Sequence, residues 1–111
     1  MVGNEVVRAL GALAQESRLE IYRQLVQAGP QGLPAGEIRD RVGIPGTTLS
    51  FHLSQLSNAG LIRSTREGRS LIYAVDFGAM QSLLGFLTEN CCQGSCDPPA
   101  PIRIQKTRKR G

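Results

Sequence analysis

The chain has 111 residues, of which 41% are hydrophobic and 20% are charged. These values are typical of one small globular domain, and they exclude a chain that is disordered throughout. No apolar run approaches the roughly 18 residues that a membrane helix needs, and the first residues lack the basic flank and apolar stretch of a secretory signal. We therefore expect a cytoplasmic protein that has no membrane partner.

The formal net charge of +4 is concentrated near the carboxyl terminus. Residues 103–110 contain five basic side chains and no acidic one, whereas the rest of the chain has eight basic and nine acidic side chains. The overall basic charge is therefore weak evidence for a DNA-binding face on the folded part. We expect residues 97–111 to form a disordered basic tail, which either aids solubility or contacts phosphates without sequence preference.

The first part of the chain predicts two helices. Over residues 2–14, apolar side chains recur at i, i+4 and i+7, which is the spacing of one helix face. A second helix is expected to begin at Ser17, because Ser17 and Glu20 fit a capping box, and to end at the Gly-Pro pair of residues 29–30.

Two short helices are predicted next, over residues 34–42 and 45–58. Each begins with a proline, which suits a first helical turn, and Gly43 lies between them. Two short helices joined by a glycine-containing turn are the signature of a helix-turn-helix. The buried stripe of the second helix consists of Leu49, Leu53 and Leu56.

Residues 61–65 and 70–75 favour strands on either side of a tight turn over 66–69. Asp76 is expected to cap a final helix, and the periodicity ends after Asn90. The sequence thus predicts a mainly α fold with a small β-hairpin, a winged helix-turn-helix. It would occupy residues 1–90, followed by a cysteine segment over 91–96 and the basic tail.

The helices at the two ends of the domain have apolar stripes that a small body would leave partly uncovered. Pairing of these helices across a two-fold axis would bury that surface, so we expect a homodimer. The predicted interface residues are Val6, Leu10, Leu13, Met80, Leu83, Leu84 and Leu87.

The helix-turn-helix predicts an interface with double-stranded DNA. Once its leucines are buried, the second helix has short polar side chains for phosphates and base edges. The hairpin adds arginines that would contact the backbone beside the groove or enter the minor groove. The predicted DNA-binding residues are Thr47, Thr48, Ser50, His52 and Gln55 on the helix, and Arg63, Arg66 and Arg69 on the hairpin.

These motifs together resemble the ArsR/SmtB family of metal-responsive repressors. The resemblance is carried by residues 13–21 (LAQESRLEI), 36–38 (GEI), 47–56 (TTLSFHLSQL), 59–62 (AGLI) and 66–73 (REGRSLIY). It implies a homodimeric winged-helix repressor that needs no cofactor to bind its operator and leaves the operator on binding an inducer. In this chain Phe51 replaces the arginine often seen beside the family's histidine, which removes one expected phosphate contact.

Two inducer sites known in the family have no counterpart here. The first helix of the helix-turn-helix contains no cysteine for the best-known arsenic site, and the last helix contains no histidine for the well-known zinc site. Instead Cys91, Cys92 and Cys96 follow the last helix. This cluster resembles that of arsenite-responsive members whose cysteines lie at the carboxyl-terminal end.

The chemistry of the cluster favours trivalent arsenic, a soft species that prefers sulfur and takes three thiolates in a pyramid. Antimonite and methylated trivalent arsenicals are equally thiophilic. Zinc usually needs a fourth ligand, so zinc or cadmium ranks second, and a reversible disulfide is a further alternative. If the last helix continued through Cys91 and Cys92, their side chains would point about 100° apart, and ligand binding would have to unwind the chain there.

Other classes of function are less well supported. An enzyme such as a thiol-dependent reductase needs a cysteine followed six positions later by arginine, and no cysteine here meets that spacing. A DNA-binding protein without a ligand would release DNA independently of the cysteines. A winged helix that binds only proteins would lack salt-dependent operator binding.

Overall fold

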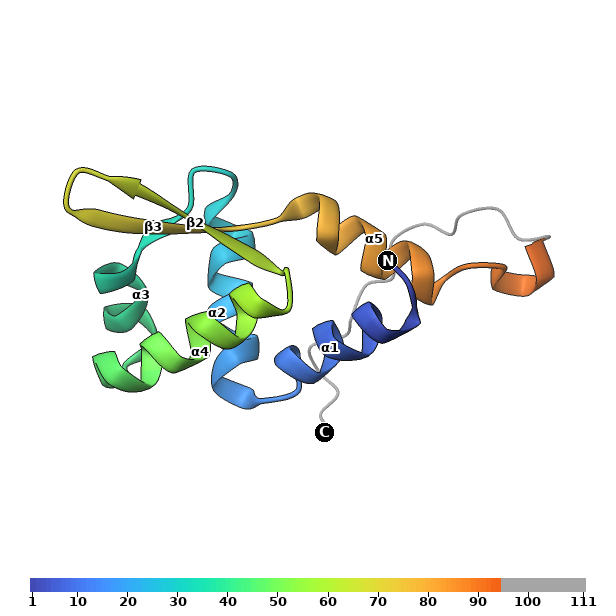
Figure 1. Cartoon of the computed structure of the whole chain (residues 1–111), viewed down its shortest axis with the longest axis horizontal. Helices are drawn as coiled ribbons and strands as arrows, with labels where there is room; N and C mark the ends of the chain where they lie inside the picture. The colour runs from blue at the N-terminus through green and yellow to red at the C-terminus, as the bar shows by residue number, and fades with distance from the viewer. Residues whose placement is uncertain (95–111) are drawn as a thin grey trace, which may run out of the picture.

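The structure, a computed structural model, describes residues 1–94 and confirms the predicted winged helix-turn-helix architecture (Figure 1). A small sheet lies along one side of helices α2, α3 and α4; its β2–β3 hairpin projects at one end of the molecule, and α5 extends toward the other. None of the helices in this range is long and apolar enough to cross a membrane. The elements are α1 Gly3–Leu13, α2 Glu16–Ala28, β1 Leu33–Pro34, α3 Ala35–Val42, α4 Gly46–Asn58, β2 Ile62–Glu67, β3 Ser70–Val75, α5 Phe77–Leu87 and a 3-10 turn, η1, Cys91–Gly94.

The core is formed around α2, which contacts α1, α3, α4 and β3. Ile21 and Leu25 of α2 are fully buried, and Ile38, Leu56 and Leu61 are buried against the same cluster. Each such side chain stabilises the fold by about 1.5–3 kcal/mol through removal of its surface from water. The helix-turn-helix, α3 and α4, is therefore seated on α2.

Two helix starts test the predicted caps. At α5 the prediction is confirmed, because the Asp76 carboxylate accepts a hydrogen bond from the backbone of Ala79 at 3.0 Å. At α2 the predicted Ser17 cap is wrong. The helix begins at Glu16, and the side-chain oxygen of Gln15 accepts from the backbone of Arg18 at 2.8 Å.

A third strand was not predicted. Pro34, expected to begin a helix, instead forms a short strand with Leu33. The two residues pair with β3 opposite Ile72 and Tyr73, giving the sheet order β1-β3-β2. The hairpin turn is also tighter than expected. Glu67 pairs with Ser70, so two residues connect the strands, and the left-handed φ of 62° at the first of them, Gly68, fits a type II′ turn.

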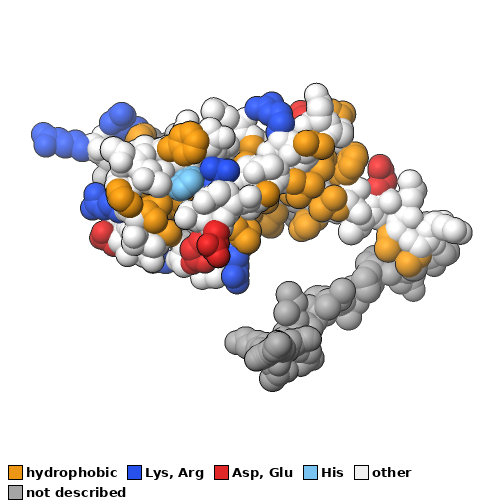
Figure 2. All heavy atoms as spheres, turned by 90° about the horizontal axis from the view of Figure 1, so that it is seen from below, with side chains coloured by type: hydrophobic (Ala, Val, Ile, Leu, Met, Phe, Trp, Pro, Cys, Tyr) orange, Lys and Arg blue, Asp and Glu red, His pale blue; other side chains and the backbone are white. Residues whose placement is uncertain are grey.

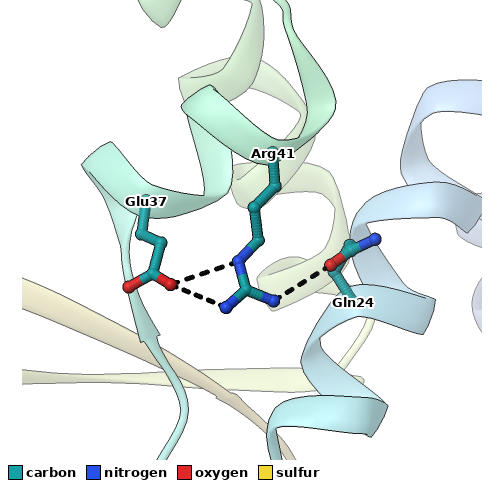
Figure 3. Close-up of polar contacts among 3 residues, drawn as sticks. All are labelled: Gln24, Glu37 and Arg41. Atoms are coloured by element: carbon teal, nitrogen blue, oxygen red, sulfur yellow. Dashed lines mark hydrogen bonds and ion pairs between the residues drawn. The ribbon is translucent and has the colours of Figure 1, made fainter.

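A polar bridge on the surface links α3 to α2 (Figure 3). The guanidinium of Arg41 lies 2.6 Å from the Glu37 carboxylate one turn earlier and donates to the side-chain oxygen of Gln24 at 3.2 Å. Both charged side chains are more than 40% exposed, so water and salt weaken the ion pair. The bridge helps to orient α3 relative to α2, whereas most of the stability of the helix-turn-helix comes from the buried core.

Gly32→Ala should destabilise the fold by more than about 2 kcal/mol. The left-handed backbone alone costs an L-residue about 1–2 kcal/mol. A Cβ at residue 32, where φ is 71°, would also overlap the backbone carbonyl of Tyr73. Urea unfolding followed by circular dichroism measures the loss. Gly46→Ala is the matched control, because that Cβ would meet nothing within 4 Å, and it should change stability by less than about 1 kcal/mol.

Candidate nucleic-acid interface and cysteine segment

Helix α4 presents a polar surface to solvent, as the predicted recognition helix should. Leu49, Leu53 and Leu56 are buried. On the opposite side Thr47, Thr48 and Ser50 are exposed, and Gln55 is half-buried. These four polar side chains are therefore accessible from outside. Their roles in DNA binding stay predictions.

The prediction that His52 faces the groove is wrong, because only 7% of this residue is exposed. Its Nδ1 lies 3.1 Å from a guanidinium nitrogen of Arg18, and the Nε of Arg18 donates to the Ala12 carbonyl at 2.7 Å. A guanidinium can only donate, so Nδ1 must accept and the proton of the neutral imidazole sits on Nε2. His52 thus fixes α4 against the end of α1.

Electrostatics favours the same neutral imidazole. Burial lowers the pKa of His52, and the positive charge of Arg18 lowers it further. Both effects act against the charged form, since desolvation penalises any ion and a nearby cation repels a second one. At neutral pH His52 is therefore an acceptor for Arg18, and its role is to position the helix.

Sequence reasoning missed Phe51, which is 56% exposed on α4. It was considered only as the loss of an arginine. Its ring contacts that of His52, with centroids 5.7 Å apart and planes inclined at 57°. The stripe of buried residues 49, 52, 53 and 56 already implies that position 51 points outward, so helical spacing alone could have identified it.

The three hairpin arginines are all exposed, but they do not form one patch. Arg63 and Arg66 are three positions apart on β2, so their side chains leave opposite faces of the sheet. Arg66 and Arg69 line one shallow hollow together with Ala35 and Gly36 at the start of α3. Of the three hairpin arginines, Arg66 and Arg69 are therefore the two that lie together beside the helix-turn-helix.

The predicted dimer residues divide into buried, half-buried and exposed groups. Val6 and Leu83 are only 4% and 6% exposed and pack in the protein's own core, so their assignment to a free face is wrong. Leu13 and Met80 are half-buried. Apolar side chains also gather at the α1 and α5 end of the molecule, away from the basic hairpin end (Figure 2). We define the apolar end-face as the exposed residues Val2, Val7, Leu10, Leu84, Phe86 and Leu87.

The cysteine segment is not a continuation of the last helix. α5 ends at Leu87, and η1 has left-handed backbone at Cys92 and Gln93. The 100° separation expected for an intact helix therefore does not apply here: the sulfurs of Cys91 and Cys92 lie 3.6 Å apart, and both residues are exposed. Cys96 and the basic tail lie outside the described residues. Within residues 1–94 no group of three potential metal ligands is assembled.

Acidification should destabilise the fold through His52. Because the folded state lowers the pKa of His52, the unfolded chain, with a histidine pKa of about 6.5, binds the proton first. This contribution to stability is complete above about pH 6.5 and is lost as the pH falls through the lower folded-state pKa. Urea unfolding between about pH 8 and pH 5 should show a steeper loss for wild type than for His52→Gln. Equal slopes would contradict the assignment.

Comparison with known proteins agrees with this architecture. A family described as a helix-turn-helix domain matches residues 13–65. The chain is 36% identical over 77 residues to the HTH-type transcriptional regulator YceK of Bacillus subtilis, covering 68% of this chain and 76% of that protein. It is 38% identical over 71 residues to the HTH-type transcriptional regulator NmtR of Mycobacterium tuberculosis, covering 64% of this chain but only 57% of that protein.

Among solved structures, the chain is similar to the homodimeric winged helix-turn-helix DNA-binding domain of Mycobacterium bovis Mb0332, a possible ArsR-family transcriptional regulator. The TM-score is 0.62 at 25% identity, covering 86% of this chain and 89% of that one. These relatives carry the names of transcriptional regulators, the class of protein that the sequence predicted for this chain. The chain belongs to the ArsR/SmtB family of winged helix-turn-helix transcriptional regulators.

Proposed function

We propose that the protein represses transcription by binding operator DNA as a homodimer, and that trivalent arsenic bound by cysteine thiolates releases it. The observation that carries the DNA-binding part is α4, whose leucines are buried while Thr47, Thr48 and Ser50 are exposed. Arg66 and Arg69 lie beside the same helix-turn-helix. Polar side chains for base edges and arginines for phosphates are the two kinds of contact that operator binding needs.

Dimerisation is supported by the apolar end-face. Its six residues lie near or on α1 and α5, and these two helices contact each other. So many exposed apolar side chains on one small chain favour burial against a second copy. The homodimeric state of the Mycobacterium bovis relative is consistent with this arrangement. Two recognition helices would then reach half-sites about 34 Å apart.

The inducer part is supported by the closeness of two cysteine sulfur atoms in the cysteine segment. The sulfurs of Cys91 and Cys92 are 3.6 Å apart. This is close to the roughly 3.8 Å between sulfurs that bind one ion through bonds of about 2.3 Å in a tetrahedron. With Cys96 the chain offers three sulfurs, the number that trivalent arsenic takes, whereas zinc or cadmium would need a further ligand. Antimonite or a methylated trivalent arsenical would use the same donors.

The position of the cysteines suggests how binding would reach the DNA. Only residues 88–90 separate the segment from α5, and α5 carries half of the apolar end-face. Ordering the segment around a ligand would alter the dimer contact and hence the spacing of the recognition helices. The coupling required is a few kcal/mol, near the typical 1–3 kcal/mol for one site, and a dimer has two sites. Reversible oxidation within the cysteine segment is a second candidate signal that uses the same coupling.

Arsenite should release the reduced protein from its operator. We would follow the fluorescence anisotropy of a labelled promoter fragment while adding sodium arsenite, with zinc chloride in a parallel titration. Micromolar arsenite should release wild type, while the variant carrying Cys91→Ser, Cys92→Ser and Cys96→Ser should stay bound, because it has no cysteine thiolate left to bind arsenic.

Three outcomes would redirect the proposal. Release by zinc alone would identify a metal other than arsenic as the inducer. Release by peroxide alone, reversed by a thiol reductant, would identify the redox alternative. DNA binding that does not weaken steeply with salt would contradict an operator-binding role.

Leu84→Glu should convert the dimer to monomer. Leu84 is 54% exposed on the apolar end-face. Burial of each leucine contributes about 1.5–3 kcal/mol, and the symmetric interface contains two copies, so the dissociation constant should rise at least about a hundredfold. Sedimentation equilibrium measures this change. Leu71→Glu is the matched control, because Leu71 is 38% exposed but lies on β3, and it should leave the dimer intact.

A further inference from the structure

Phe51 lies on the exposed face of α4, near its middle turn. Successive helical residues are rotated by about 100°, which places position 51 opposite the buried stripe and between positions 47 and 54. Thr47 and Ser54 are both exposed, and Phe51 itself is 56% exposed. An aromatic hydrocarbon therefore projects from the exposed face of the recognition helix among short polar groups.

The ring is supported from behind but is not covered. Within the described residues, its ring contact is with His52, whose imidazole Arg18 holds in place. Such a tilted arrangement is favourable for two aromatic rings and restricts the motion of the exposed one. The contact with His52 therefore restricts the orientation of the Phe51 ring. Much of the ring's apolar surface remains in contact with water, which costs free energy.

The major groove offers one kind of apolar partner for such a ring. Adenine, guanine and cytosine present hydrogen-bond donors and acceptors there, which a phenyl ring cannot pair with. Thymine adds its C5-methyl group, which does form apolar contacts with side chains such as phenylalanine. We propose that Phe51 reads the C5-methyl group of a thymine in each operator half-site. This inference rests on the proposed operator binding and adds to it a determinant of sequence specificity.

Replacing thymine by deoxyuridine tests the contact, because this removes the methyl group and leaves the hydrogen-bonding edge unchanged. After footprinting locates the operator, each thymine would be replaced in turn and the affinity measured by anisotropy. For wild type, deoxyuridine at one symmetric pair of positions should weaken binding about tenfold. Each methyl group lost should weaken it by about three- to fourfold, and the pair contains two.

The variants decide whether Phe51 is responsible. Phe51→Ala should bind the thymine operator more weakly and lose its sensitivity to deoxyuridine at those positions. Ser54→Ala, on the same exposed face, should keep that sensitivity in full. Phe51→Leu retains an apolar side chain and should keep part of it. Because position 51 is exposed, all three should fold, which circular dichroism would verify.

Two results would overturn the inference, and they differ in what they leave standing. Specific binding by wild type that is insensitive to deoxyuridine everywhere, or sensitivity that persists in Phe51→Ala, would refute the methyl contact alone. A wild-type protein that binds no promoter fragment specifically would refute both this inference and the proposed function.

Discussion

The orientation of the recognition helix depends on one guanidinium. Arg18, on α2, donates to the Ala12 carbonyl at the end of α1 and to His52 in the middle of α4. Arginine suits this position because its rigid, permanently charged group can direct hydrogen bonds to acceptors on different elements. Removing it would leave a carbonyl and an imidazole without partners in a partly buried place, a loss of about 1–3 kcal/mol for each unsatisfied group.

A second arginine links the same two helices. Arg8 on α1 donates to the carbonyl of Asn58, the last residue of α4, at 2.7 Å. α1 is therefore attached to the recognition helix at its middle, through Arg18, and at its end. Because α1 also contacts α5 and carries part of the apolar end-face, a shift in how two copies pair would be transmitted to α4 through polar contacts of defined geometry.

The sequence predicted those features that depend on local periodicity or a local cap, including the helix-turn-helix, the hairpin and the Asp76 cap. It failed for β1, because two residues have no period and their pairing with β3 is a long-range contact. His52 was misplaced because it was grouped by polarity, although it lies three residues after Leu49 on the buried stripe. The apolar stripes of α1 and α5 could not show that Val6 and Leu83 face the protein's own core. A helix face that packs in the core and one that packs against a partner have the same hydrophobic pattern.

The strand order of the sheet implies a second role for the hairpin arginines, beside the proposed contact with DNA. β3 is paired on both sides, so β2 is the long strand whose outer edge is open. Charged side chains on such an edge discourage addition of a strand from another molecule, which is a common route to aggregation. Arg63, Arg66 and Glu67 place charges on this edge, so replacing them with neutral residues should make the hairpin more prone to pair with a strand of another molecule. Selection for a soluble edge and selection for phosphate contacts would both preserve arginine on this strand.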